Sequence, residues 1–422
     1  MEKLAINGGK PVRETPFPTN MLGASLYGEE ELKEVADVIN NRSPFRFYGI
    51  GSPDKVATLE KNVCEKFGVK YALAVSSGTS ALSCAVAALG LGPGDEVILP
   101  SFAWYSDYCT LVSLGVLPVF ADIGEDLNLD PKDFEKKITE RTKAVLIVHY
   151  QGTPAKMDEI MPIAKAHNLF VIEDCAQAFG GSYKGQRLGT FGDIATVSFQ
   201  THKMITSGEG GLIYTNNEDL YIRAVRYHDL GSVRPFFSDK LEHPEKADKK
   251  DAIPGLQLRM SELQGAALVA QFRKLDYILD KCRTYHAVLR KYIAENYPNL
   301  KVRYEDGDCG IAFIMLMDSK EMADAFNAAM VAEGIPCGPT SFCPNLLENP
   351  PISTRAVVHP ALPPFGPGCA GENVWYDAKT DCLNTNDMID RFVAIGIGPT
   401  YTDKEIADII AAFDKVIPQI CG

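Results

Sequence analysis

Residues 71–90 read YALAVSSGTSALSCAVAALG, and this stretch decides the fold. Residues 71–75 form an apolar run that is typical of a strand buried on both faces of a sheet. A short turn of Ser and Gly follows, and residues 79–90 have the composition of a buried helix. A strand that turns directly into a helix is the repeating unit of α/β proteins.

The same alternation continues outward in both directions, which predicts an α/β fold with a mostly parallel, seven-stranded sheet. Further strands are predicted at residues 96–100, 116–120, 144–148, 169–174, 193–199 and 210–215. Helices are predicted at residues 28–41, 54–67, 106–114, 156–167 and, as one long stretch, 260–296.

The texture changes after Pro298, where strands at 301–306, 311–317 and 392–398 and helices at 320–333 and 403–417 predict a smaller α+β unit. A chain of 422 residues exceeds what one core usually serves. We therefore expect an N-terminal arm at 1–24, a large cofactor-binding domain at 25–275 and a small C-terminal domain at 276–422. The Pro- and Gly-rich residues 338–370 predict a long functional loop.

Net charge, hydropathy and cysteine spacing argue against several classes of protein. The net charge of −13 disfavours nucleic acid and anionic membranes as partners. No apolar stretch approaches the roughly 20 residues that span a bilayer, and the N-terminus has no signal-peptide core. The eleven cysteines are scattered without a metal-binding spacing. We expect a cytoplasmic protein with reduced thiols and no metal.

Chemically useful residues follow the predicted strands, where ligands of open α/β sheets collect. In SSGTSA (76–81), Gly78 permits close approach of a ligand, and Thr79 and Ser80 add hydroxyls beside the amides of a helix N-terminus. Such a turn is a phosphate cradle. It is equally an ordinary helix cap.

Two more strand ends carry candidates. Asp174 ends a buried strand in IEDCAQAFGG (172–181), where a carboxylate is costly unless a positive group meets it. Gln177 follows three residues later. Trp104 lies just past the strand at 96–100. The alternatives are a helix cap for Asp174 and a core or interface aromatic for Trp104.

Lys203 lies in SFQTHKMITSGEGG (198–211), five residues after Ser198 and ahead of a run of small residues. It is either a solvated loop charge or an amine needed for covalent chemistry. A phosphate site, a strand-end carboxylate, a flat aromatic and a confined lysine together suit pyridoxal 5′-phosphate. Lys203 would form the Schiff base, and Asp174 would keep the pyridine nitrogen protonated.

Five separated motifs also carry a family resemblance, namely SSGTSAL (76–82), PGDEVILPSFAW (93–104), EDCAQAFGGSYKGQRLGTFGDIATVSF (173–199), THKMITSGEGG (201–211) and PGLQLRMSELQGA (254–266). In order and spacing the chain resembles the fold-type I aminotransferases named for DegT, DnrJ, EryC and StrS, which act on keto-sugars and keto-cyclitols. TSGEGG and the start AINGGKPVR look like the branch that acts on scyllo-inosose-type cyclitols.

The resemblance implies a pyridoxal phosphate-dependent aminotransferase with catalytic Lys203 and Asp174. It also implies a cofactor site made of Gly78, Thr79, Ser80, Trp104, Asp174, Gln177, Ser198, Lys203 and Gln257. Gln257 replaces the family's Asn in G-x-N-x-R, which reaches the phosphate of the neighbouring subunit, so a homodimer with shared sites is expected. The implied reaction is a ping-pong transfer from L-glutamate or L-glutamine to a keto-sugar or keto-cyclitol, in amino-sugar, aminocyclitol or antibiotic biosynthesis.

Several alternatives stay open at this point. A dehydratase or lyase with the same cofactor would share these motifs, although relatives of that type carry His in place of Lys203. A non-enzymatic regulator would need a DNA-binding appendage or a lost lysine. Arg187 and Arg259 could bind the donor carboxylate or lie at the surface. His149 could face the substrate or be a core histidine.

Overall fold

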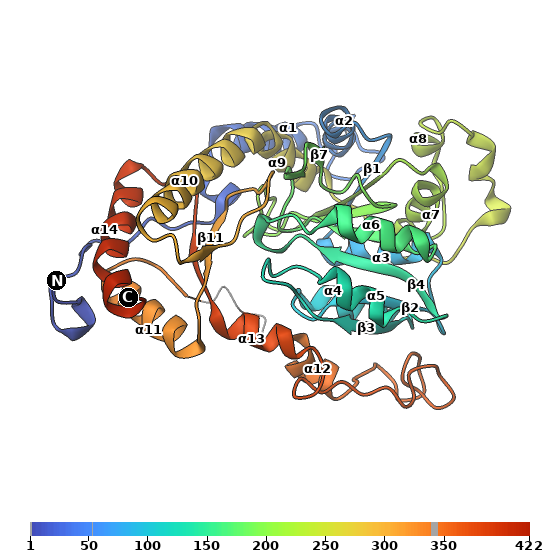
Figure 1. Ribbon diagram of the computed structural model, residues 1–422. Coiled ribbons are helices and arrows are strands. Elements are labelled where there is room, and N and C mark those ends of the chain that lie inside the picture. The colour runs from blue at the N-terminus through green and yellow to red at the C-terminus, as the bar shows by residue number, and fades with distance from the viewer. Residues whose placement is uncertain (1, 53, 339–344) are drawn as a thin grey trace.

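A computed structural model describes residues 2–52, 54–338 and 345–422 (Figure 1). Its main feature is a seven-stranded sheet with the order β1-β9-β8-β5-β4-β2-β3, which confirms the predicted sheet. Every strand runs parallel to the others except β9, which is antiparallel to both of its neighbours. The strands are β1 (Tyr71–Val75), β2 (Glu96–Pro100), β3 (Leu117–Ala121), β4 (Thr142–Val148), β5 (Phe170–Asp174), β8 (Ile194–Ser198) and β9 (Gly211–Thr215).

Helices cover both faces of this sheet because its side chains alternate between two apolar clusters. One cluster takes Val171 of β5 and packs against α2 (Lys55–Phe67), α6 (Met157–Ala166) and α9 (Glu262–Arg273). The other takes Ile172 and packs against α3 (Gly78–Leu89), α4 (Tyr105–Ser113) and α7 (Glu218–His228). Two apolar faces explain why the strands read as continuous hydrophobic runs.

A second sheet lies at the other end of the molecule (Figure 1). It is antiparallel, with the order β10 (Lys301–Val302), β11 (Ala312–Leu316) and β12 (Phe392–Gly396). Helices α10 (Leu275–Asn296), α11 (Lys320–Ala332) and α14 (Asp403–Ile420) pack beside it. The exact division at 24/25 and 275/276 stays a prediction.

The long helix predicted at 260–296 is wrong in one respect, because it is two helices, α9 and α10, that meet at Lys274. The amide of Lys274 bonds the carbonyl of Gln271, three residues back, at 2.9 Å. Its amine bonds the carbonyl of Leu26 at 2.8 Å and the carboxylate of Glu31 at 2.6 Å. No Pro or Gly marks this change of direction in the sequence.

Several elements had no counterpart in the sequence-based expectations. They include α5 (Pro131–Lys137), the hairpin of β6 (Ser182–Tyr183) and β7 (Gln186–Arg187), the short α8 (Pro235–Ser238) and α13 (Leu383–Arg391). Short 3-10 turns lie at Ala5–Asn7, Leu22–Leu26, Tyr150–Gly152, Pro244–Ala247 and Lys249–Asp251. The predicted first helix is α1 (Glu29–Asn40).

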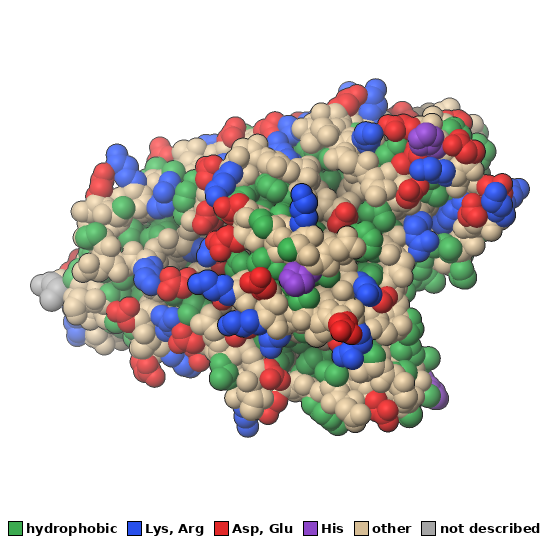
Figure 2. Space-filling view, turned by 45° about the vertical axis from the view of Figure 1, so that its right-hand side comes forward, with side chains coloured by type: hydrophobic (Ala, Val, Ile, Leu, Met, Phe, Trp, Pro, Cys, Tyr) green, Lys and Arg blue, Asp and Glu red, His purple; other side chains and the backbone are tan. Residues whose placement is uncertain are grey.

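The predicted loop at 338–370 falls partly on residues 339–344, which lie outside the described residues. From 345 onward it is largely irregular, with short helices at Leu346–Glu348 and α12 (Pro350–Ser353). The whole segment 345–378, which extends past the predicted loop, packs on the α4 side of the large sheet, where the hydroxyl of Tyr376 donates to the carbonyl of Pro118 at 2.7 Å. The segment protrudes at the bottom of Figures 1 and 2 and carries exposed apolar side chains such as Val358 and Trp375.

The N-terminal arm connects the small sheet to the lysine loop. Glu333 accepts hydrogen bonds from the amides of Ala5 (2.8 Å) and Val12 (3.1 Å). Farther along, the amide of Gly23 donates to the carbonyl of Lys203 at 3.4 Å. Among the described helices, none combines the length and apolarity needed to span a bilayer.

Candidate active site

The turn between β1 and α3 lies against the end of β8. Ser77 caps α3, and its hydroxyl accepts the amide of Ser80 at 3.0 Å. A Cβ atom at Gly78 would lie 2.7 Å from the Cβ of Ser198. Only glycine permits this approach, and it brings two of the predicted phosphate-binding segments together. The helix-cap reading is therefore correct for Ser77, and it leaves the role of the neighbouring residues open.

The other groups of this turn differ in how much of their hydrogen-bonding capacity is used. The Ser80 hydroxyl is buried and lies 2.9 Å from the hydroxyls of both Ser76 and Ser77. Thr79 is exposed at the first turn of α3. The first intrahelical bond joins the amide of Ala81 to the carbonyl of Ser77, so the amides of Gly78 and Thr79 precede it. This is the geometry in which helix N-termini hold anions.

Asp174 and Lys203 come together across the strand ends. Asp174 ends β5 on the face that packs against α3 and α4, and it is 5% exposed. The pKa of the Asp174 carboxyl is raised on balance, because burial outweighs the hydrogen bond from the amide of Ala176 (2.7 Å) and the charge of Lys203, both of which lower the pKa. Lys203 is half-buried, on a loop held by the bond from its own amide to the carbonyl of Gln200. Its charge therefore acts on a buried carboxylate.

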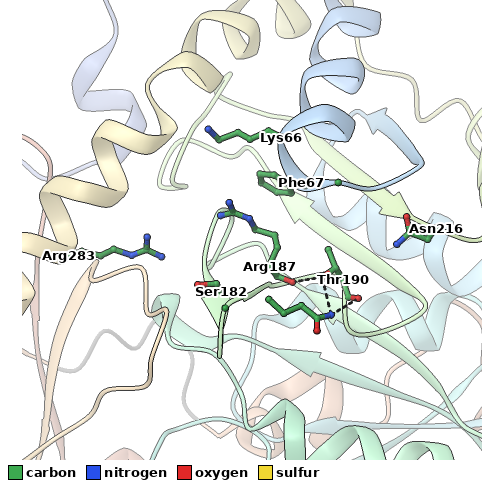
Figure 3. Close-up of a pocket in the computed structure, with 10 residues that line it drawn as sticks. Lys66, Phe67, Ser182, Arg187, Thr190, Asn216 and Arg283 are labelled. Carbon is green, nitrogen blue, oxygen red and sulfur yellow. Dashed lines mark hydrogen bonds between the residues drawn. The ribbon is translucent and has the colours of Figure 1, made fainter.

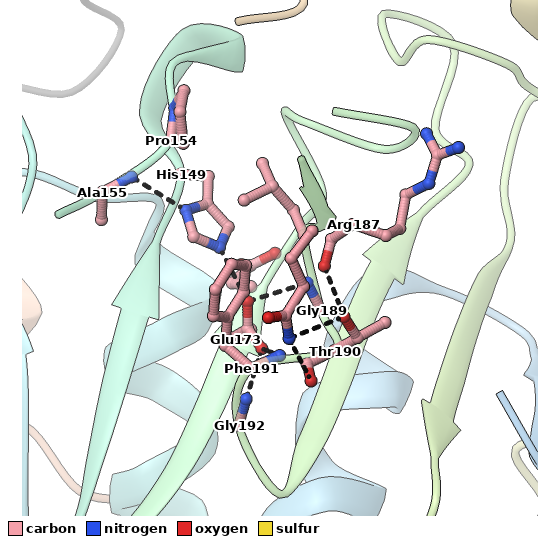
Figure 4. Close-up of polar contacts among 12 residues, drawn as sticks. His149, Pro154, Ala155, Glu173, Arg187, Gly189, Thr190, Phe191 and Gly192 are labelled. Carbon is pink, nitrogen blue, oxygen red and sulfur yellow. Dashed lines mark hydrogen bonds and ion pairs between the residues drawn. The ribbon is translucent and has the colours of Figure 1, made fainter. Parts of the chain in front are cut away.

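The preceding residue, Glu173, points to the opposite face and is saturated with donors (Figure 4). Its carboxylate accepts the amides of Gly189 (2.8 Å), Phe191 (2.8 Å) and Gly192 (2.6 Å). It also lies 3.2 Å from Nε2 of His149. Glu173 thus fixes the loop that follows the β6–β7 hairpin.

His149 is a core histidine rather than a substrate-facing one. It is fully buried, and its Nδ1 accepts the amide of Ala155 at 3.1 Å, so Nε2 carries the proton that faces Glu173 (Figure 4). Cys175 brings a third ligand-type atom within 4.8 Å of these two groups. Because the hydrogen bonds occupy both nitrogens of His149, this cluster is built as structural support.

Asp107 was missed by the sequence analysis. It lies in the first turn of α4 with no exposed surface, and in the described part of the chain neither carboxyl oxygen has a donor. It faces Asp174 and Lys203. Burial and then the charge of Asp174 raise the pKa of Asp107 well above its ordinary value. An acid in a first helical turn is ordinarily explained by its favourable interaction with the helix dipole, so an inward orientation could not be predicted from the residues around Asp107.

Gln177 and Trp104 flank the same edge of the sheet. The side-chain oxygen of Gln177 accepts the amide of Gln151 at 2.9 Å, which leaves its NH₂ group to donate. Trp104 precedes α4 at the end of β2 and is 49% exposed, with its ring centroid 5.1 Å from that of Tyr105. A half-exposed tryptophan at a strand end is available to a ligand, in contrast to a core aromatic.

Gln257 lies beside this edge with an exposed side chain, while its backbone bridges to Asp229. Its neighbour Leu256 is 51% exposed. Arg259, by contrast, is engaged within the chain: its Nη1 lies 2.5 Å from the Asp229 carboxylate, and its guanidinium lies over the ring of Phe45. This pairing favours a structural role for Arg259.

Arg187 lies in a different pocket, of about 620 Å³ (Figure 3). The polar lining includes Lys66, Thr190 and Arg283, and it contains none of the residues predicted to hold the cofactor. Arg187 donates to the carbonyl of Gly180, and its guanidinium lies 4.8 Å from the centre of the Phe67 ring. The structure thus places Arg187 away from Lys203.

The groups at the strand ends fit a phosphorylated pyridine aldehyde. They supply an amine on Lys203, a buried carboxylate on Asp174 and a helix N-terminus opened by Gly78. In register with Asp174 on the neighbouring strand, the buried hydroxyl of Thr196 has no partner within the described ranges. An unsatisfied buried polar group needs an explanation, and a ligand bound at the strand ends would supply one for Thr196. The individual roles of these residues stay predictions.

Comparison with known proteins adds independent evidence. The model of the DegT/DnrJ/EryC1/StrS aminotransferase family, whose cofactor is pyridoxal 5′-phosphate, matches residues 27–362. A putative L-glutamine:3-amino-2,3-dideoxy-scyllo-inosose aminotransferase of Micromonospora echinospora is 37% identical over 292 residues, which are 67% of this chain and 64% of the relative. GDP-perosamine synthase of Escherichia coli O157:H7 is 38% identical over 241 residues, or 56% of this chain and 63% of the relative.

The matched parts thus span slightly less than two thirds of the length of these relatives. Among solved structures, the aminotransferase from Psychrobacter cryohalolentis superposes with a TM-score of 0.77 at 26% identity, covering 97% of this chain and all of the other. It confirms the predicted fold-type I architecture over nearly the whole chain. Because the family model spans well over half of the sequence, the chain belongs to the DegT/DnrJ/EryC1/StrS aminotransferase family.

Proposed function

We propose that this protein is an aminotransferase that moves an amino group from L-glutamine or L-glutamate to a keto-sugar or keto-cyclitol in two half-reactions. The observation that carries the proposal is the juxtaposition of Lys203 with the buried carboxylate of Asp174 at the strand ends. An amine and a carboxylate placed together at this edge are what the family's cofactor requires. Lys203 also argues against the dehydratase alternative.

Each residue has a definite task in this reaction. When bound, pyridoxal 5′-phosphate supplies the electron sink that makes the donor's Cα–H bond acidic. Lys203 would hold the cofactor aldehyde through its Nζ and, once released, would take up the donor's Cα proton on that atom and give it back, acting as base and then as acid. Asp174 would hold a proton on the pyridine nitrogen through its negative charge. The α3 N-terminus, with Ser198, anchors the phosphate.

The donor and the acceptor are proposed from the relatives. L-glutamine appears in the name of the Micromonospora relative, together with an amino-dideoxy-scyllo-inosose. GDP-perosamine synthase instead points to a nucleotide-linked sugar. We favour a keto-cyclitol acceptor and L-glutamine, since the motif TSGEGG at 206–211 resembles the cyclitol branch.

We further propose a homodimer in which Gln257 reaches the cofactor phosphate of the other subunit. The support is the exposed position of Gln257 and the exposed apolar side chains beside it, Leu256 and Leu263. Two-fold symmetry would place each Gln257 at the opposite site. Exposed apolar side chains are a feature of contact surfaces where they gather on one face.

The test follows the transferred nitrogen. Purified protein loaded with pyridoxal 5′-phosphate receives L-glutamine labelled with ¹⁵N at the α-amino group, together with either a scyllo-inosose-type ketone or a nucleotide-linked keto-sugar. An aminotransferase yields an amine that carries the label, measured by mass spectrometry. A dehydratase would consume the ketone, but its product would contain no ¹⁵N. That result would overturn the proposal. Protein with Lys203→Ala is the matched control.

A further inference from the structure

Asp107 is a buried acid that the proposed reaction does not use. Its carboxyl has no exposed surface, and neither of its oxygens has a hydrogen-bond donor among the described residues. An ionised carboxylate in that condition carries a large desolvation cost. The structure therefore has to supply either a cation or a proton.

The positive charge nearest to Asp107 is that of Lys203, and Asp107 shares it with Asp174. The charge of Lys203 acts on both Asp107 and Asp174. One amine cannot balance two carboxylates, and the predicted chemistry consumes that amine when the cofactor is attached. Within α4, the neighbouring groups are Tyr108, whose hydroxyl donates to the carbonyl of Pro351 at 3.3 Å, and the thiol of Cys109. Neither supplies positive charge.

The two carboxyl groups are within hydrogen-bonding reach of each other. Two ionised carboxylates only accept hydrogen bonds, so a bond between them requires one proton. Asp174 already accepts the amide of Ala176 at 2.7 Å, which stabilises its charged form. The amide of Trp104 slightly lowers the pKa of Asp107 but does not reach hydrogen-bonding geometry, and Asp107 is the more deeply buried of the two acids. The proton accordingly belongs on Asp107.

We propose that Asp107 is a neutral carboxylic acid that donates a hydrogen bond to Asp174 and so keeps that carboxylate ionised and oriented for the cofactor nitrogen. Its function toward the cofactor rests on the proposed function, whereas its protonation state does not. With Asp107 neutral, the pair carries one negative charge, which matches one pyridinium. With both ionised, their repulsion would drive a proton onto Asp174 and remove its ability to hold the pyridinium.

The proposal makes Asp107 a positioning residue, and two substitutions separate its possible states. Asp107→Asn keeps the size and supplies an NH₂ donor to Asp174, so it imitates a protonated acid. Asp107→Leu keeps approximately the size and removes the donor. If Asp107 acted as an anion, both substitutions would be equally harmful.

The first measurement uses the protein without cofactor and is independent of any reaction. Infrared difference spectra of wild type against Asp107→Asn, recorded in H₂O and D₂O, should show the carbonyl band of a protonated carboxylic acid in the wild type from about pH 6 to about pH 8, far above the ordinary aspartate pKa. Absence of that band throughout this range would overturn the proposal, even if the protein proves to be an active aminotransferase.

The second measurement reads the cofactor site. With pyridoxal 5′-phosphate ¹⁵N-labelled in the ring, the nitrogen chemical shift should report a protonated ring in wild type and Asp107→Asn, and a partly deprotonated ring in Asp107→Leu. Cofactor affinity should stay within about twofold for Asn and fall about tenfold for Leu. Circular dichroism establishes that each variant folds. If Asn is as damaging as Leu, or if the Asn variant does not fold while wild type lacks the acid band, the assignment is wrong.

Discussion

Glu173 and Asp174 are consecutive buried acids on one strand, and they differ completely in how their oxygens are used. Glu173 faces the β6–β7 side and accepts three backbone amides, with His149 as a further partner. Asp174 faces the α3–α4 side and accepts one amide, next to a lysine and a second acid. Burial is almost the same for both. Unused hydrogen-bonding capacity therefore separates the acid that builds the fold from the acid that we propose to serve a ligand.

The largest expected loss of turnover comes from removing Lys203, the amine next to Asp174. Lys203→Ala removes the base and the attachment point, so turnover should fall by about 10⁴-fold. The borohydride-reducible link to the cofactor should disappear, as measured by mass spectrometry of the reduced protein. Lys184→Ala, which alters an exposed lysine paired with Asp158, is the control and should leave turnover unchanged. A reducible link that persists in Lys203→Ala would assign the chemistry to another lysine.

The next effect tests the two neighbouring acids directly. Asp174→Asn keeps the shape but removes the charge at the pyridine nitrogen, so turnover should fall by at least about a hundredfold. Glu173→Gln, measured per folded molecule, should stay within a few-fold of wild type. Equal losses from both substitutions would erase the functional difference between the two faces of the strand.

For thermal stability we expect the reverse order, with Glu173→Gln more damaging than Asp174→Asn. In Glu173→Gln an NH₂ group replaces an acceptor oxygen and opposes backbone amides, which costs about 1–3 kcal/mol. The melting temperature of the cofactor-free protein should fall by at least about 2 °C in calorimetry. Asp174→Asn, which disturbs one amide bond, should change it less. A larger loss from Asp174→Asn would show that Asp174, too, is mainly structural.

The last test concerns the exposed Gln257, and the measured effect is a partial recovery of activity in mixed dimers. Lys203→Ala and Gln257→Trp should each be inactive alone, the second by blocking the partner's site. Random re-association places an intact Lys203 and an intact Gln257 together in one site of each mixed dimer. About a quarter of the wild-type sites should then work. Proven heterodimers without recovered activity would exclude shared sites.

Sequence patterns predicted the features that depend on neighbouring residues in the chain, namely the strands and the functional residues at their ends. The apolar runs are the seven strands, and the residues that follow them, Gly78, Asp174 and Lys203, lie at one edge because parallel strands end together. The reversal of β9 was not predictable from its pattern. A strand buried on both faces reads the same in either direction.

The remainder depends on contacts between distant segments. The break at Lys274 follows from the attraction of its amine to Glu31, 243 positions away, and no helix-stop residue announces it. Asp107 looks like any acid in a first helical turn. Only the packing of α4 against α3 and β3 turns it inward, toward Asp174.

One contact of the N-terminal arm has a consequence for anyone who builds mutant libraries of this enzyme. A side chain at Gly23 would place its first carbon 2.8 Å from the Cα of Ile205 and 2.9 Å from the carbonyl oxygen of Met204. Both belong to the loop that carries Lys203, and backbone cannot move aside as a flexible side chain can. Codon randomisation at position 23 should therefore return almost only glycine, although this position lies 180 residues before the lysine whose loop it touches.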